Sequence, residues 1–277
     1  MKQITIYLAT FLAVSVFYLL ALPLQKIVTF PLTGLVHTID GIIVMIIASK
    51  LWRDPATRQS TNSAKTYFLY FFITVGIFQL IMGLTHLILY INAGMFVEVM
   101  NWGYIIGHVF LYLSLALALM VPLELIFPGK KIKYYAASLI GIFGLAITYI
   151  NITKPTHPVY ESTTGITFFN VDPAVGGLIP IIVLLSWGVA AIMFIINGIK
   201  SRRNRIVLVR SLVISVGFII TIVGGPLHDV AKTSAQFLIA DILTLLGFLT
   251  LASGIALASG PDEQSSVPVA PQPLSQG

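Results

Sequence analysis

Residues 66–91 read TYFLYFFITVGIFQLIMGLTHLILYI and contain no Asp, Glu, Lys or Arg. A helix needs roughly 20 apolar residues to cross the ~30 Å hydrocarbon core of a bilayer, so this stretch predicts a membrane-spanning helix. The whole chain has the same character, because 57% of its 277 residues are hydrophobic and 9% are charged. Soluble domains carry about 25% charged residues. The sequence therefore predicts an all-α, multi-pass membrane helix bundle.

Eight stretches are long and apolar enough to span the membrane. They lie near 3–24, 32–51, 66–91, 101–127, 134–152, 176–199, 206–227 and 236–259. The first could instead be a cleaved signal peptide, because Lys2 precedes an apolar run. The length of that run and the lack of a small-residue cleavage site favour a retained helix. We expect one transmembrane bundle over 1–259 and a disordered cytoplasmic tail over 260–277, which is rich in Pro and poor in apolar residues.

The basic residues indicate how the bundle is oriented. Lys2 and the segments at the ends of the second, fourth and sixth predicted helices hold all but three of the 16 Lys and Arg residues. The other three are Lys26, Lys154 and Lys232, on the opposite side. Cytoplasmic loops carry an excess of Lys and Arg, so we expect both termini in the cytoplasm and the protein in the cell membrane. This explanation is preferred over nucleic-acid binding.

A weak internal repeat relates the two halves of the chain. Residues 73–83, ITVGIFQLIMG, align with residues 214–224, ISVGFIITIVG, and a histidine follows each segment within five residues. The match predicts that halves 1–128 and 129–259 are parallel repeats of four helices about an axis along the membrane normal. Chance similarity between two apolar segments is the alternative.

A glycine precedes a histidine by three residues at three places. The pairs are Gly34 and His37, Gly83 and His86, and Gly225 and His228. Residues three apart share one helix face, so each pair offers an imidazole beside a position without a side chain. This combination suits a planar ligand such as haem, or close helix contact around a metal. The topology also puts His108 on the external side, and at 1.5 Å per residue three of the four histidines lie about 10 Å below the outer boundary.

Polar and small residues form a stripe at helical spacing on three predicted helices. The stripes are Gln79, Gly83, His86 and Tyr90; Asn101, Tyr104, His108 and Tyr112; and Gly217, Thr221, Gly224 and His228. Polar stripes in lipid face the bundle interior, because unsatisfied polar groups are costly there. We therefore expect the four histidines to form one cofactor or metal site. Asp40 and Asp241 would accept hydrogen bonds from the histidine rings and so fix their orientation, as carboxylates do for metal-bound imidazoles. For each histidine alone, a hydrogen bond between helices is the alternative, and His157 is expected to be solvated.

Haem b held by two histidines, either His86 with His228 or His37 with His108, fits these residue types. The arrangement broadly resembles that of membrane b-type cytochromes, in which histidines on neighbouring helices hold haem. It differs in that every candidate lies toward one face. Copper is the alternative cofactor, because thioethers suit Cu(I). Three methionines lie on the same side: Met82, Met95 and Met100.

The expected function is electron transfer or sensing at a haem b or redox-metal site near the outer face. The expected partners are the lipid bilayer and other membrane subunits or a redox partner. One alternative is a small-ligand or proton-coupled transporter or receptor-like binding protein, and another is a non-catalytic scaffold subunit.

A zinc-dependent membrane hydrolase is disfavoured, because no His-x-x-x-His pair is present. The chain has no cysteine, which excludes iron–sulfur clusters and thiolate metal sites. Whether it is an enzyme is left open.

Overall fold

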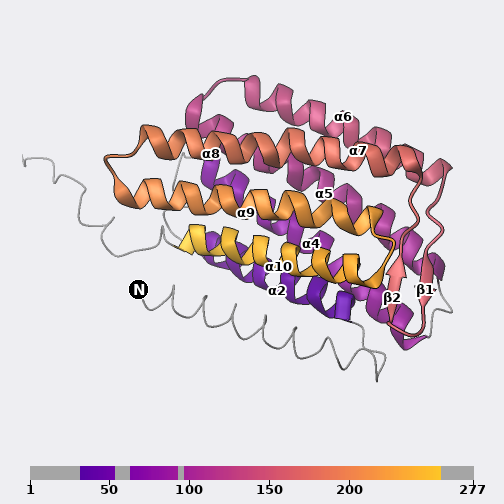
Figure 1. Ribbon diagram of the computed structural model, residues 1–277. Helices are drawn as coiled ribbons and strands as arrows, with labels where there is room; N and C mark the ends of the chain where they lie inside the picture. The colour runs from indigo at the N-terminus through magenta and orange to yellow at the C-terminus, as the bar shows by residue number, and fades with distance from the viewer. Residues whose placement is uncertain (1–31, 54–62, 93–96, 257–277) are drawn as a thin grey trace, which may run out of the picture.

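The computed structural model describes residues 32–53, 63–92 and 97–256 (Figure 1). The predicted helix 3–24, the segment that contains Met95, and the predicted tail 260–277 lie outside the described residues. The predictions for these segments therefore stay predictions.

Nearly all of the described chain is helical. The elements are α2 (Leu32–Arg53), α4 (Ser63–Ile91), α5 (Val97–Ile126), α6 (Ile132–Thr153), α7 (Pro173–Val183), η1 (Leu184–Gly188), α8 (Val189–Lys200), α9 (Arg205–Val230) and α10 (Ser234–Ala256). Since α7, η1 and α8 run on as one span, the described residues contain seven helices long and apolar enough to cross a membrane. These seven match the predicted spans from 32–51 onward, and the all-α, multi-pass fold is confirmed. The four-plus-four repeat stays a prediction.

Local sequence signals explain several helix ends. The Asp172 carboxylate accepts a hydrogen bond of 2.9 Å from the backbone N–H of Ala174, and Pro173 starts α7. The Asn204 side chain likewise caps α9, where it accepts from the backbone N–H groups of the second and third residues of that helix. Both are favoured N-terminal arrangements. Gly129, with φ of +72°, makes the tight turn between α5 and α6 that a residue with a Cβ adopts with strain.

The helix α9 is longer than the sequence predicts. The predicted span ends near residue 227, but α9 continues through Pro226 to Val230. A proline inside a helix removes one backbone hydrogen bond. The side chains of His228 and Asp229 make buried hydrogen bonds to α10 and α5, which hold this last turn in place.

A short hairpin covers one end of the bundle, which we term the hairpin end (Figure 1). Its strands, β1 (Val159–Glu161) and β2 (Ile166–Phe168), are antiparallel and lie between the predicted spans 134–152 and 176–199. Phe169 follows β2 and is 2% exposed, and its ring centroid lies 4.9 Å from that of Tyr104. The turns α5–α6 and α8–α9 lie at the opposite end and carry Lys and Arg, so we term it the basic end.

Candidate functional site

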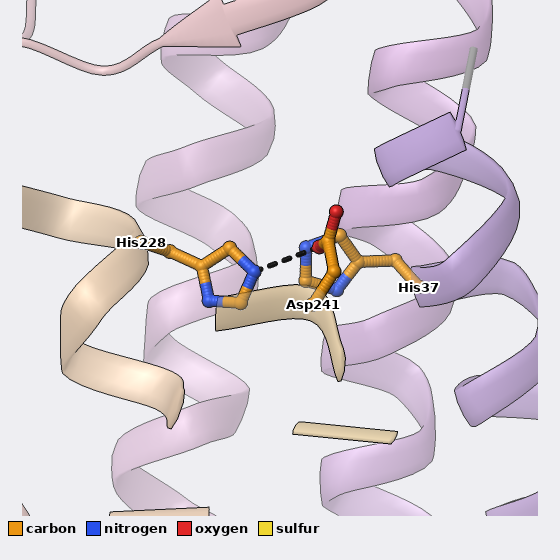
Figure 2. Close-up of side chains that lie close together, drawn as sticks. All are labelled: His37, His228 and Asp241. Carbon is orange, nitrogen blue, oxygen red and sulfur yellow. Dashed lines mark hydrogen bonds and ion pairs between the residues drawn. The ribbon is translucent and has the colours of Figure 1, made fainter. Parts of the chain in front are cut away.

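Three helices bring His37, His228 and Asp241 together near the hairpin end (Figure 2). They come from α2, α9 and α10; α2 is far from the other two in the sequence, whereas α9 and α10 follow one another. One ligand atom from each residue lies within 4.8 Å of the ligand atoms of the other two. All three side chains are buried, and Asp241 is 0% exposed. Histidine nitrogens and a carboxylate at this separation form a group that could hold a metal ion.

Hydrogen bonds fix the orientation of these side chains. Nε2 of His228 lies 2.9 Å from Oδ1 of Asp241, and the hydroxyl of Thr33 donates to Oδ2 of Asp241 at 3.0 Å. Nδ1 of His37 donates to the side-chain oxygen of Gln79. With its proton on Nδ1, the His37 imidazole presents the Nε2 lone pair as a ligand atom.

His86 supplies a further imidazole beside this group. Its ring centroid lies 5.7 Å from that of His37, and its Nδ1 donates to the backbone oxygen of Met82 at 2.8 Å. This bond again places the proton on Nδ1. Nε2 of His86 is buried and has no hydrogen-bond partner among the described residues. A buried nitrogen without a hydrogen bond lowers the stability of the fold, and a ligand bound at Nε2 of His86 would remove that cost.

The fourth predicted histidine, His108, belongs to a second polar group. Nε2 of His108 lies 3.9 Å from Oδ1 of Asp229, and the Tyr104 hydroxyl donates to the same oxygen at 2.7 Å. Sequence reasoning missed Asp229, because the predicted helix ended before it. The usable signal was an acidic residue directly after His228 in an apolar segment, which is rare in membrane helices unless it has a function.

The two polar groups face a common cavity of about 50 Å³. His37 and His228 line it from the first group, and His108 and Asp229 line it from the second. Trp187 Nε1 and Thr244 Oγ1 belong to lining residues, are buried, and have no hydrogen-bond partner among the described residues. A buried water needs about 10–15 Å³ of such space and at least two polar partners. The cavity therefore has the room and the polarity for water or a small polar ligand.

The charges around the cavity favour a cation. Asp229 lines the cavity, Asp241 bonds to the lining residue His228, and no Lys or Arg is among the lining residues that the structure describes. Each carboxylate lies beside a histidine ring nitrogen, at 3.9 Å for Asp229 and 2.9 Å for Asp241. A positive ion would interact most strongly with Asp241, whose carboxylate is one of the candidate ligands.

The three glycines of the Gly-x-x-His pairs have different surroundings. A Cβ on Gly34 would lie 3.0 Å from Cβ of His86, and a Cβ on Gly83 would lie 2.9 Å from the backbone oxygen of Gly34. These two glycines therefore allow α2 and α4 to approach closely, and the neighbouring helix fills the space beside them. Gly225 lines the cavity, and no atom lies within 4 Å of the position of its Cβ.

Asp40 lies one turn after His37 on α2 but is not part of the ligand group. Its side chain is 0% exposed, and neither carboxylate oxygen has a hydrogen-bond partner among the described residues. Asp241, which was predicted to lie behind the histidines, instead lies among the candidate ligand atoms. Met82 lines the cavity, whereas His157 is exposed, as its sequence context predicts.

Comparison of the chain with models of protein families, with curated proteins and with solved structures finds no match. The functional argument therefore rests on the geometry of the site.

Proposed function

We propose that this membrane protein binds one transition-metal ion through His37, His228 and Asp241. One observation carries the proposal: the three ligand atoms come from three different helices and lie within 4.8 Å of one another. Two imidazoles and one carboxylate are the protein ligands of many catalytic zinc sites and of non-haem iron sites. Nε2 of His86, which lacks another partner among the described residues, would be the fourth donor.

The hydrogen bonds around the cluster support this proposal. Metal-binding histidines almost always donate their other ring N–H to a carbonyl or carboxylate oxygen. His37 does so to Gln79, and His86 does so to the backbone of Met82. Asp241 is in turn held by the Thr33 hydroxyl. An ion bound here would replace the hydrogen bond between Nε2 of His228 and Oδ1 of Asp241, and the proton of that bond would be released.

The proposed role is a metal centre at which a small polar ligand or an electron can reach the ion. The cavity of about 50 Å³ beside His37 and His228 provides the space for such a ligand. With copper or iron as the ion, the centre would serve the predicted electron transfer or sensing, and Met82 in the cavity wall favours copper. Haem b remains a prediction. A single ion is favoured over haem because the cavity measures about 50 Å³, whereas cofactor pockets usually measure about 300–1,000 Å³.

Metal analysis of the purified protein tests this proposal. Protein purified in mild detergent should contain about one equivalent of a transition metal, and His37→Ala and His228→Ala should each remove it. His108→Ala is the matched control, because His108 is equally buried but bonds to Asp229. Equal metal content in wild type and in folded His228→Ala would contradict the proposal. A Soret band in the absorption spectrum would assign the site to haem b instead.

Proton-coupled or ligand-coupled transport is a second candidate, favoured by Asp40. An intramembrane carboxylate without a partner is a typical proton or substrate group of transporters. Uptake into proteoliposomes that Asp40→Asn abolishes, with metal content unchanged, would support transport. Equal uptake by wild type and Asp40→Asn would exclude this role for Asp40.

A further inference from the structure

An apolar groove of about 420 Å³ lies between α5 and α6, separate from His37, His228 and Asp241. Leu113 and Ala116 line it from α5, and Gly141 and Leu145 line it from α6. Figure 1 shows α6 at the edge of the bundle, beside α5. Both helices are long and apolar enough to span the membrane, so the groove lies at the depth of the lipid chains.

Two glycines of α6 give the groove its shape. A Cβ on Gly144 would lie 2.6 Å from Cβ of Tyr112, so Gly144 lets the two helices touch. At Gly141 no atom lies within 4 Å of the position of a Cβ, so this glycine leaves the groove open. The groove covers residues 109–120 of α5, which is about 17 Å at 1.5 Å per residue. That length is close to half of the ~30 Å hydrocarbon core, the share of one leaflet.

The groove ends close to two exposed lysines at the basic end. Tyr134, which lines the groove, is 52% exposed and lies three residues after Lys131. Lys130 and Lys131 are exposed and form no ion pair with a described residue. The nearby Lys133 is neutralised by its ion pair with Glu124. Tyrosines at the level of the lipid headgroups and basic clusters just outside the membrane are typical of contacts with anionic lipids.

We propose that this groove binds one anionic phospholipid from the leaflet at the basic end. Its phosphate would lie at Lys130 and Lys131, and one acyl chain would lie along Gly141 between α5 and α6. The apolar lining matches the chain, the length matches one leaflet, and the two lysines match the negative headgroup. This inference is independent of the metal proposal.

A photocrosslinker at Leu145, which lines the groove and is 70% exposed, identifies the occupant without filling the groove. Because the chain has no cysteine, Leu145→Cys provides one attachment point for a benzophenone maleimide. Illumination of the labelled protein in nanodiscs of phosphatidylglycerol and phosphatidylcholine should yield a lipid adduct enriched in phosphatidylglycerol. A crosslink to residues 3–24 or to a second copy of the chain would overturn the proposal.

Native mass spectrometry of unlabelled protein provides the second test. Wild type should retain one phosphatidylglycerol, and Gly141→Leu should lose it, because the leucine fills the groove. Gly177→Leu is the matched control, since its Cβ also has no atom within 4 Å but lies on α7, outside the groove. Lys130→Gln and Lys131→Gln should each reduce the preference for phosphatidylglycerol about fivefold. Equal lipid retention by wild type and Gly141→Leu would refute the assignment.

Discussion

Asp241 contacts residues of both other helices in the candidate site, α2 and α9. It bonds to His228 through one oxygen and to Thr33 through the other, and it lies within ligand distance of His37. In the proposed metal site a carboxylate in this position would have two roles, since it would add negative charge at the ion and orient the histidine beside it. The site should therefore be sensitive to the charge of this side chain and not only to its shape.

We expect Asp241→Asn to weaken metal binding about 10–100-fold, the usual effect of altering groups that orient metal ligands. The amide keeps the size of the side chain but removes its charge. Competition with a chromophoric chelator measures the affinity. Asp229→Asn is the control, because Asp229 is also buried but bonds to Tyr104 on the other side of the cavity. Equal losses in both variants would argue against a site centred on Asp241.

The sequence predicts which residues face the interior but not which of them meet. Helical spacing and topology put His37, His86 and His108 at one depth, whereas the structure brings together the rings of His37, His86 and His228. The same reasoning could not tell that His108 lies beside Asp229. Spacing along one helix fixes a face and a depth, whereas the partner across the bundle depends on how the helices pack.

At the scale of elements, the contact between α2 and α4 brings His37 close to His86. A Cβ on Gly83 would lie 2.8 Å from the backbone nitrogen of Thr38, so the two helices touch through their backbones. Small residues at such contacts are the usual basis of close helix packing in membranes. Any larger residue at this position must push α2 away and with it His37.

We expect Gly83→Ala to destabilise the fold by about 1–3 kcal/mol, the usual cost of overpacking. Thermal unfolding in detergent, followed by circular dichroism, measures the change. Gly177→Ala should instead leave the stability unchanged or raise it by up to about 1 kcal/mol, because no atom lies within 4 Å of the added methyl group. A Gly83→Ala variant as stable as wild type would contradict the described α2–α4 contact.

The hairpin closes the cavity through Phe169. The Phe169 ring lines the cavity, and its centroid lies 5.7 Å from that of His86. We expect Phe169→Ala to let chelators remove the metal several times faster, with a smaller change in equilibrium affinity, because no ligand atom is lost. Stopped-flow transfer of the metal to a chelator measures the rate. Phe168→Ala, next to it in the chain but outside the cavity lining, should leave the rate unchanged.

The sequence predicts the helices better than it predicts the connections. Length and apolar content mark a spanning helix whatever its neighbours are, and all seven described spans were predicted. The strands β1 and β2 have three residues each, too few for an alternating pattern to stand out. The seventh predicted helix ends near residue 227, but α9 continues to Val230, where side chains of the last turn make buried hydrogen bonds.

At the scale of the whole molecule, the basic turns predict the orientation in the membrane. The chain has no cysteine, so single cysteines report on one position each. His157→Cys at the hairpin end should react with a membrane-impermeant maleimide applied to intact cells. Arg202→Cys at the basic end should react only after the membrane is permeabilised, because basic segments stay in the cytoplasm. The reverse labelling pattern would invert the topology.

The central claim is that one ion is held where α2, α9 and α10 meet. Titration of metal-free protein with zinc, in competition with a chromophoric chelator, tests it most directly. We predict one tightly bound zinc ion per wild-type chain and a free energy of unfolding raised by about 2.7 kcal/mol at a free zinc concentration of 100 Kd. The doubly substituted chain, His37→Ala with His228→Ala, should show neither effect while it remains folded. Equal zinc binding by both proteins, or none by wild type, would contradict the claim.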